Sequence, residues 1–420
     1  MNGLDLVYIA AAGVTAPWWA RKARGGWRGR RGFLDVQLPE KRRGVTRVLL
    51  HAVSVGETNA IRGLVPMLAG EFGCEGVVSA WTDTGLARSR ELYERMDRVW
   101  VVRYPLDFSR CVRRFLDAVK PDVVGLVELE MWPNFSLTCR RRGVPVCVIN
   151  GRLSERSFKG YLRARPVLKG MFGALAAAGV QDEAYAERFR AMGTPADRVV
   201  VTGSMKWDSV AMADEVEGAE ELAREMGIDR SRPLIVAGST APGEDRLLDE
   251  ACPEGVQLLC APRKPEWFDG AYTDLGGEGR CVRRSVVKSG GAGARGGRDR
   301  VLLDTIGGLR KAYSLADVAV VGRSFGELYG SDPIEPAALG KAVVIGPAVS
   351  DFANVVAAFE AGGGIVRATR ESLKGELERL ISDAGLRRTL GERARACIRA
   401  QQGATRRHAE MLMGAVGKRM

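Results

Sequence analysis

A carboxylate that could act as a base lies in the segment HAVSVGETNAIRG, residues 51–63. An apolar strand pattern ends before Ser54 and a helical pattern starts near Thr58, so Gly56 and Glu57 fall in the turn between them. Open α/β sheets bind ligands at this edge, and a carboxylate there can deprotonate a substrate hydroxyl if its pKa suits. The alternative is that Glu57 only caps the helix.

Two further acids lie in VELEMWPN, residues 127–134, where another strand leads into a turn and a helix. Glu128 and Glu130 are two residues apart at the strand end, so we expect them to point to the same side and their repulsion to raise one pKa. Pro133 fits an early helical position. The alternative is that both acids are solvated residues at the sheet edge.

Small residues that could cradle a phosphate follow three strands, in VTGSMKWD, GSTAPGE and APRKPE. Ser204, Ser239 and Thr240 lie where strands end, and exposed backbone N–H groups at such places bind phosphate. Lys206 and Arg263 would supply positive charge. Each segment alone is a weak indication, because turns of this kind also occur without a ligand.

A last carboxylate lies in the segment YGSDPIEPAALGKAVVIGP, residues 329–347. Glu335 is flanked by Pro333 and Pro336 at the start of a helix of small residues. It could hold a ribose diol by accepting two hydrogen bonds, as the acid of dinucleotide-binding folds does. Helix capping alone would need no ligand.

Several chemistries are nearly excluded by composition. The chain has only two histidines and no Walker lysine motif, which argues against histidine triads and two-histidine metal sites. Its eight cysteines contain no CxxC pair and fit neither a disulfide framework nor a zinc site. Carboxylates, lysines and arginines must therefore do the chemistry, and a reducing cytosol is the expected environment.

The elements that position these residues alternate between strands and helices. Strand-length runs such as VTRVLLHAVSV and GVVSAW enclose the helical stretch TNAIRGLVPMLAGEF, a rhythm typical of parallel α/β sheets. A second series of strands begins at PLIVAGS, and 420 residues suffice for two or three domains. We therefore predict two doubly wound, Rossmann-like domains with the break between Gly203 and Arg232.

Positive charge is in excess, with 63 Lys and Arg against 51 Asp and Glu and a formal charge of +12. Such a balance favours a polyanionic partner, either nucleic acid or an anionic membrane. Hydrophobic residues make up 46%, which excludes collagen-like, mostly disordered and multispanning membrane proteins. The Gly/Arg-rich segment 289–300 is expected to be a solvated surface loop, although it could also touch RNA.

The N-terminal segment predicts an association with a membrane. Residues 4–20 are apolar except for Asp5 and Thr15, and RKARGGWRGRR follows them. The run is marginal for crossing a bilayer, which takes about 20 apolar residues. Charge on its C-terminal flank favours a monotopic anchor, whereas the alternative is a buried first helix of a soluble fold.

Taken in order, HAVSVGE, YPLD, ELEMWPN, NGRLSERSFKGY, TGSMKWD, GSTAPGE, APRKPE, DTIGGL and DPIEPAALGK resemble the Kdo transferases. Those enzymes move 3-deoxy-D-manno-octulosonic acid (Kdo) from CMP-Kdo onto the lipid A precursor in lipopolysaccharide synthesis. The resemblance extends to about Asn354. It implies a GT-B fold with a cleft between two Rossmann-like domains, no cofactor or metal, and a location at the cytoplasmic face of the inner membrane. Nucleic acid is then not an expected partner.

The same resemblance implies a domain plan. Residues 1–32 would form the anchor and its basic flank, 33–202 the acceptor domain and 203–395 the domain that binds the CMP-sugar. Residues 396–420 would form a helix that returns to the first domain.

Site roles follow from the matching motifs. Glu57 would be the base for an inverting transfer, while Glu128 and Lys206 would stabilise the transition state. The role of Lys206 makes physical sense because a leaving phosphate needs fixed positive charge. The residues expected to bind CMP are Pro262, Arg263, Ile306, Gly307, Gly308, Asp332, Pro333, Ile334 and Glu335. Supporting positions are Ser54, Gly56, Glu130, Ser204, Ser239 and Thr240.

The chain departs from the family pattern at a few positions. Ser331 and Asp332 replace the usual His and Asn, Lys264 replaces a His, Gly308 a common Glu, and Leu129 a Thr. An acid beside a phosphate costs affinity, but beside the cytosine amino group it can accept a hydrogen bond. These changes affect the expected nucleotide affinity more than the reaction type.

Two other hypotheses remain at this stage. The altered SDPIEP segment would suit a GT-B transferase or epimerase that uses another sugar nucleotide. The charge and the Gly/Arg segment would suit a relative that has lost catalysis and binds membranes or nucleic acid.

Overall fold

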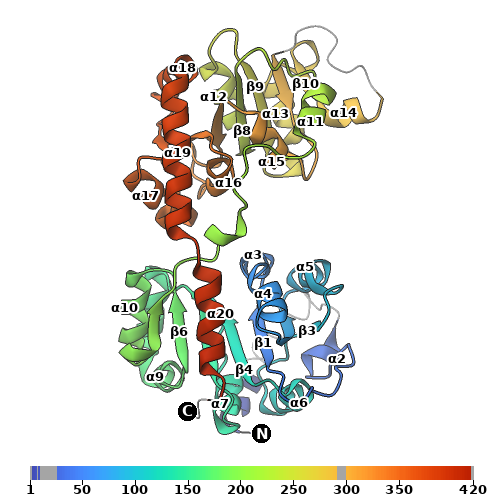
Figure 1. The fold of residues 1–420 in the computed structure, drawn as a ribbon, viewed down its shortest axis with the longest axis vertical. Coiled ribbons are helices and arrows are strands. Elements are labelled where there is room, and N and C mark those ends of the chain that lie inside the picture. Colours follow the sequence, from blue (N-terminus) through green and yellow to red (C-terminus); the bar gives the residue numbers. More distant parts are fainter. Residues whose placement is uncertain (1, 7, 10–25, 291–298, 418–420) are drawn as a thin grey trace. The chain divides into compact units, whose positions relative to one another are not determined.

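The computed structural model describes residues 2–6, 8–9, 26–290 and 299–417, and the chain divides into two compact units (Figure 1). Unit 1 comprises Met1–Ser209 and Gln401–Met420, and unit 2 comprises Val210–Ala400. The boundaries expected after residues 202 and 395 lie a few residues earlier. The differences have local causes: residues 203–209 are hydrogen-bonded into unit 1, and helix α19 (Ala384–Gln401) continues unbroken to the second boundary.

Unit 1 contains a seven-stranded parallel sheet in the order β3-β2-β1-β4-β5-β6-β7. All the residues of β1, β2, β4 and β5 are buried, as expected for parallel strands covered by helices on both faces. The connections run one way from β1 and the other way from β4, so the switch point of the sheet lies between these two strands. The strands are β1 (Arg47–Ala52), β2 (Glu75–Ala80), β3 (Val99–Arg103), β4 (Val123–Val127), β5 (Val146–Gly151), β6 (Ala177–Val180) and β7 (Val199–Val201).

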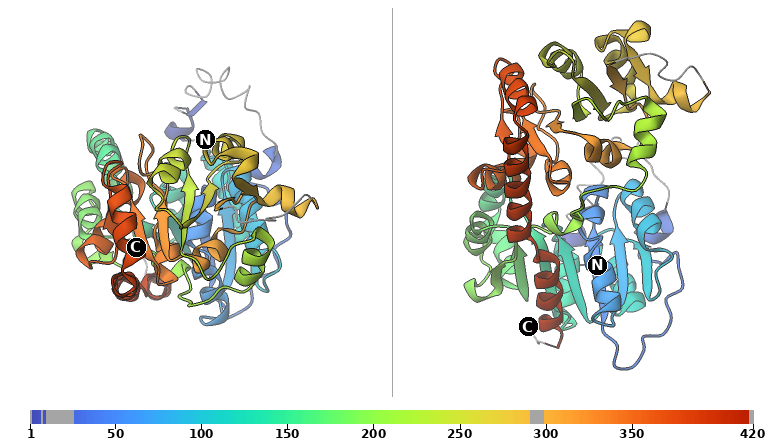
Figure 2. Two further views of the ribbon diagram at one scale, coloured as in Figure 1. Left: turned by 90° about the horizontal axis from the view of Figure 1, so that it is seen from above. Right: turned by 45° about the horizontal axis from the view of Figure 1, so that its top comes forward.

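Helices cover both faces of this sheet and form a separate core on each. Phe115 of α6 and Phe135 of α7 belong to one core, and Leu64 of α4 and Leu412 of α20 belong to the other. Figure 2 shows the C-terminal helix α20, in dark red, against the cyan and green strands of unit 1. The helices are α2 (Trp27–Arg30), α3 (Val55–Ala60), α4 (Leu64–Gly70), α5 (Asp83–Tyr93), α6 (Ser109–Val119), α7 (Pro133–Arg141), α8 (Glu155–Arg163), α9 (Arg165–Gly173), α10 (Glu183–Met192) and α20 (Ala404–Ala415), with short η1 (Ala196–Arg198) and η2 (Trp207–Ser209).

Unit 2 repeats the plan with a parallel sheet in the order β10-β11-β9-β8-β12-β13-β14, whose switch point lies between β8 and β12. The strands are β8 (Leu234–Thr240), β9 (Gln257–Pro262), β10 (Cys281–Arg283), β11 (Arg300–Leu302), β12 (Val318–Val321), β13 (Ala342–Ile345) and β14 (Val366–Arg367). The helices are α11 (Ala219–Met226), α12 (Glu244–Ala251), α13 (Phe268–Asp274), α14 (Arg284–Lys288), α15 (Leu309–Leu315), α16 (Ile334–Ala338), α17 (Ala353–Ala361), α18 (Leu373–Ser382) and α19, with short η3 (Pro265–Trp267), η4 (Gly277–Gly279) and η5 (Ser350–Phe352). The prediction of two Rossmann-like units is confirmed.

The predicted N-terminal anchor falls largely on residues 10–25, outside the described residues. In the parts of the chain that are described, no helix is both long and apolar enough to cross a membrane. The described N-terminal residues, 2–6 and 8–9, contact the rest of unit 1 through polar groups. The Asp5 carboxylate accepts hydrogen bonds from Ser109 N at 2.8 Å and Ser109 Oγ at 2.6 Å, so it caps α6. Most of the Gly/Arg-rich segment, residues 291–298, also lies outside the description.

Candidate active site

Glu57 lies just after β1 at the switch point of unit 1, as the sequence predicted. It belongs to the first turn of α3 rather than to a turn before the helix, because the helix begins at Val55 and not near Thr58. Its carboxylate accepts hydrogen bonds from Val53 N at 2.8 Å and from Ser54 Oγ at 3.0 Å. Ser54 is the N-cap of α3 and accepts from Glu57 N at 3.4 Å in return. The capping role that the spacing suggested as an alternative is therefore present. Gly56 is exposed beside them.

The Glu57 carboxyl also has the acidity that a general base needs. The side chain is buried, with 9% exposed, and burial raises its pKa to about 7 against the hydrogen bond from Val53. The negative charges of Glu130 and Glu128 raise it further. A carboxylate with a pKa near neutrality exchanges protons readily at cellular pH, so capping and base catalysis are compatible in one residue.

Glu128 does not belong to the strand that precedes it. β4 ends at Val127, and Glu128 adopts a left-handed backbone with φ 59°. The prediction that Glu128 and Glu130 share a face by strand alternation is therefore wrong, because the backbone turns between them. Repulsion still operates: the pKa of Glu130 is raised by burial and by the charge of Glu128. A non-glycine residue in this conformation costs free energy and is typical of functional turns.

Lys206 returns to this edge of the sheet although it follows β7, at the sheet's far side. The neighbouring Met205 N–H donates to Asn150 Oδ1 at 3.1 Å, and Asn150 lies near the end of β5, beside β4. Ser204, which is nearly buried, accepts from Lys206 N at 3.4 Å and shapes the turn. The ends of β1, β4 and β5 thus bring Glu57, Glu128 and the Lys206 segment to one edge of unit 1.

In unit 2 the predicted phosphate-binding segments follow adjacent strands. The chain after β9 is tied to the end of β8 by the hydrogen bond from Arg263 N to Thr240 O at 3.0 Å, and the Arg263 side chain is exposed. Ser239 has a left-handed backbone with φ 58°. Glu244 joins the segments after β8 and β12, accepting from Ala241 N at 2.9 Å and from Arg323 N at 2.7 Å.

Some of the predicted binding residues offer no side chain to a ligand. Thr240 is 0% exposed and its hydroxyl donates to the buried Asp245 carboxylate at 2.7 Å. Ile334 is likewise 0% exposed and belongs to the interior, and Pro333 is buried. Pro262 is a buried residue at the end of β9. These residues shape the edge of the sheet. Because their side chains are buried, only their backbone groups remain to bind a ligand.

The segment 304–308 combines an exposed apolar side chain with two glycines. Ile306 is 83% exposed, the most exposed of the large apolar side chains in the described residues, and Gly307 has a left-handed φ of 95°. At Gly308 a Cβ would lie 2.8 Å from Arg284 Nη1, so the space beside this residue is filled by a guanidinium that pairs with Glu225.

The segment around Glu335 contains two acids with different partners. Asp332 Oδ1 accepts from Ile334 N at 3.0 Å at the start of α16, so an acid at this departure from the family pattern acts as a cap. Glu335 lies 3.9 Å from Arg310 Nη1 of α15. Tyr313, on the same helix, packs against β8: a Cβ at Gly238 would lie 2.1 Å from its hydroxyl, so only glycine fits there. Burial and the charges of Glu335 and Asp332 raise the Tyr313 pKa.

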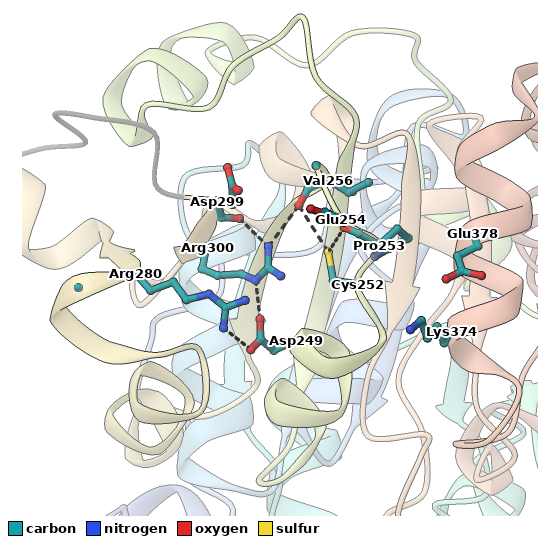
Figure 3. Close-up of a pocket in the computed structure, with 12 residues that line it drawn as sticks. Asp249, Cys252, Pro253, Glu254, Val256, Arg280, Asp299, Arg300, Lys374 and Glu378 are labelled. Carbon is teal, nitrogen blue, oxygen red and sulfur yellow. Dashed lines mark hydrogen bonds and ion pairs between the residues drawn. The ribbon is translucent and has the colours of Figure 1, made fainter.

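The described residues also form a hollow of roughly 650 Å³ in unit 2 that includes none of the predicted site residues (Figure 3). Its lining includes Val256, just before β9, and Arg300, which begins β11, so it lies at the amino edge of the sheet. Asp249 accepts from Arg280 and Arg300 there, at 2.6 and 2.5 Å. Its arginines are thus engaged in ion pairs on the opposite edge from the predicted chemistry.

Four residues at the two carboxyl edges were not singled out from the sequence: Asn150, Glu244, Arg310 and Tyr313. Asn150 and Glu244 lie in two of the motifs that carry the family resemblance, NGRLSERSFKGY and GSTAPGE, so the sequence contained a signal for both. Arg310 follows DTIGGL directly. Tyr313 gave no local signal, because its role depends on a glycine far along the chain.

Comparison with known proteins shows which family the chain resembles. The family model described as 3-deoxy-D-manno-octulosonic-acid transferase (kdotransferase) matches residues 25–209. The 3-deoxy-D-manno-octulosonic acid transferase of Bordetella pertussis is 34% identical over 388 residues, covering 87% of this chain and 86% of its own. The enzyme of that name from Haemophilus influenzae is 27% identical over 380 residues, with the same coverage of 87% and 86%.

Solved structures share the architecture at low identity. A glycosyltransferase from Rickettsia africae aligns with a TM-score of 0.60 and 12% identity, covering 89% of this chain and 100% of that one. Anabaena HepE in complex with UDP-glucose gives a TM-score of 0.57 at 14% identity, covering 88% of this chain and 99% of that one. At these identities the likeness concerns the fold alone.

Proposed function

This chain belongs to the Kdo transferase family, and from that premise we propose that it moves Kdo from CMP-Kdo to a lipid A precursor in lipopolysaccharide synthesis. It is a glycosyltransferase. The observation that carries the proposed mechanism is the buried Glu57 carboxyl at the switch point of unit 1, whose pKa is about 7 and which lies close enough to Glu128 and Glu130 to be affected by both charges.

The proposed reaction is an inverting displacement. Glu57 takes the proton of the acceptor hydroxyl, and the resulting oxygen forms a bond to the anomeric carbon of Kdo. The bond from that carbon to the CMP phosphate oxygen breaks, and CMP leaves with the electron pair. Lys206 and the exposed Arg263 supply positive charge for the leaving phosphate, and Glu128 together with Lys206 stabilises the transition state. We propose that neither a metal ion nor another cofactor takes part.

We also propose that unit 1 binds the lipid acceptor through exposed basic and apolar side chains. Helices α6 and α7 contact each other, and both carry exposed arginines: Arg110, Arg113, Arg140 and Arg141. Apolar side chains are exposed on the N-terminal part of the same unit, with Leu6 at 62% and Trp27 at 46%. Basic and apolar groups together favour binding to anionic lipid, which supports a location at the cytoplasmic face of the inner membrane.

The direct test is mass spectrometry of the products that the full chain makes from CMP-Kdo and a tetraacylated disaccharide bisphosphate. We expect an added Kdo mass, unchanged when EDTA is present. A parallel thermal-shift experiment compares CMP with UDP, because a ligand stabilises only the fold that binds it. Preferential stabilisation by UDP without Kdo transfer would favour a transferase for another sugar nucleotide. Salt-dependent binding to nucleic acid without any transfer would favour a non-catalytic relative.

A further inference from the structure

Asn150 connects the two segments that carry Glu128 and Lys206. It lies at the carboxyl end of β5, is 0% exposed, and adopts a left-handed backbone with φ 52°. Asparagine tolerates this conformation better than most residues. The residues on either side bind the backbone of Glu128: Glu128 N donates to Ile149 O at 2.9 Å, and Arg152 N donates to Glu128 O at 3.4 Å.

The Asn150 side chain reaches toward Lys206. Its amide oxygen accepts the Met205 N–H at 3.1 Å, one residue before Lys206, and Met205 itself is 1% exposed. Ser209 Oγ donates to Lys206 O at 2.7 Å and closes the turn. The position of the lysine is therefore set by a buried hydrogen bond and a buried side chain, in addition to the course of the chain.

The C-terminal helix fixes Asn150 from the other side. His408 of α20 is 0% exposed, and its Nε2 accepts the Asn150 N–H at 3.2 Å. A Cβ at Gly179 would lie 2.6 Å from His408 Cε1, so the strand beside it must carry glycine for the imidazole to fit. Accepting through Nε2 requires the neutral imidazole with its proton on Nδ1.

Helix α20 also holds the Lys206 segment directly. The Asp208 carboxylate accepts from Gly403 N at 2.7 Å and from Thr405 N at 2.5 Å, where α20 begins. Gln402 Nε2 donates to Trp207 O at 3.2 Å. Residues 205–209 are thus held on one side by Asn150 and on the other by the start of α20.

From these contacts we propose that Asn150 is a positioning residue for Kdo transfer. Its amide oxygen holds Lys206 at a fixed place relative to Glu128, and α20 belongs to the catalytic apparatus because His408 and Asp208 fix the same contacts. The inference rests on the proposed roles of Lys206 and Glu128. It adds a residue, and a helix more than 250 positions away in sequence, to the machinery.

The test is a double-variant cycle on the full chain, with kcat and the KM for CMP-Kdo as readouts. Asn150→Gly removes the amide but tolerates the left-handed backbone. We expect kcat to fall about 10- to 100-fold, since a displacement of about 1 Å can cost that much, while KM changes less than about threefold. If Asn150 acts through Lys206, the double variant with Lys206→Ala should be no slower than Lys206→Ala alone.

Two further variants keep the proposal falsifiable. Asn150→Asp retains an oxygen that can accept the Met205 N–H, so it should recover most of kcat. It also answers the question if the glycine variant fails to fold. Glu75→Gln is the matched control: it weakens a buried ion pair with Arg47 at the amino edge of the same sheet, and should lower stability without changing kcat.

The outcomes separate this inference from the proposed function. Additive losses in the cycle, or a folded Asn150→Asp variant without catalysis, would overturn the positioning role while Kdo transfer by the unaltered chain stands. Absence of any Kdo product from the unaltered chain would instead refute the function itself. A Lys206→Ala variant with full turnover would remove the lysine, and with it the reason for holding its segment.

Discussion

At the scale of single residues, Glu57 performs a structural task and a proposed chemical task that one substitution can separate. Glutamine still offers an oxygen to Val53 N or Ser54 Oγ, but it cannot take a proton. We therefore expect Glu57→Gln to fold normally and to lose about 10²- to 10⁴-fold in kcat, the usual contribution of a general base. Turnover close to that of the unaltered chain would remove Glu57 from the mechanism.

The acidity of Glu57 predicts a pH profile. Because the base must be ionised and its pKa is raised to about 7, kcat/KM should rise with pH and level off above about 7. The profile is measured with CMP-Kdo at subsaturating concentration between pH 5 and 9. A profile that is already level from about pH 5.5 upward, as an unperturbed glutamate with a pKa of 4.5 would give, would show that burial does not act on the catalytic group.

Both histidines of the chain predict a loss of stability in acid. Burial lowers the pKa of His51 and of His408 from 6.5 to about 3, so between these values the unfolded chain binds protons that the folded chain does not. The contribution of each histidine to stability is therefore fully present above pH 6.5 and falls as the pH decreases, by about 2 kcal/mol at pH 5. The raised pKa values of Glu57 and Asp107 act in the opposite direction, because these carboxyls bind protons more tightly in the folded chain.

Urea unfolding of unit 1 at pH 7 and pH 5 measures this effect, with the stacked Trp81 and Trp132 as fluorescent reporters. Between pH 7 and pH 5 the variant His51→Gln should gain about 2 kcal/mol of stability relative to the unaltered chain, because it lacks the His51 contribution. His51 stacks on Tyr104 at 3.6 Å, so the comparison is made between pH values within each variant rather than between variants. The same pH dependence in the unaltered chain and in His51→Gln would contradict the prediction, because Glu57 and Asp107 are common to both.

At this scale, an interaction could be predicted when the two residues that form it are close in the sequence. Glu57 was found because Ser54 and Glu57 are three residues apart and the turn that holds them is local. The left-handed backbone of Glu128 was not found, because nothing in ELEMWPN states a backbone angle. The bond between Asn150 and His408 joins residues 258 positions apart, and no local pattern encodes such a pair.

At the scale of elements, helix α6 takes its cap from the N-terminal segment. Its own N-cap position, Phe108, has no capping side chain, and the Asp5 carboxylate accepts the Ser109 N–H instead. We expect Asp5→Ala to cost about 1–2 kcal/mol and to accelerate hydrogen exchange in the first turn of α6. Asp5→Asn, which keeps an acceptor oxygen, is the control. Unchanged exchange after Asp5→Ala would show that residues 2–9 do not support this helix.

The strands and helices could be predicted from the sequence wherever a local pattern of apolar residues determines them. The strands of both sheets appeared as apolar runs because parallel strands are buried on both faces. The strand was expected to continue past the actual end of β4, since Glu128 continues the apolar-polar pattern while its backbone leaves the strand. The sheet order, with β1 beside β4, was not predicted, because no local pattern states which strands pair.

At the scale of the whole molecule, unit 1 is built from two separate stretches of the chain, whereas unit 2 is built from one. Unit 2 is a single stretch, Val210–Ala400, with its own two cores, so we expect this fragment to fold alone and to unfold cooperatively in a thermal melt. Residues 1–209 without α20 should not, because Leu412 and Ala409 of that helix belong to a core of unit 1.

The control for this experiment is a fusion of residues 401–417 to residue 209 through a Gly/Ser linker, which restores the helix to unit 1. Far-UV circular dichroism and the thermal midpoint should recover in the fusion and remain poor in the truncated chain. A truncated chain that melts as sharply as the fusion would show that α20 is dispensable for the fold of unit 1.

The late position of α20 in the chain also sets the order of events during synthesis. Translation delivers all seven strands of the unit 1 sheet before the helix that covers part of one face, and the whole of unit 2 is made in between. While the ribosome works through those residues, the apolar side chains of Leu50 and Ile149 lack their Leu412 neighbour. The second unit can therefore mature before the first, and nascent chains at that stage are natural clients for a chaperone.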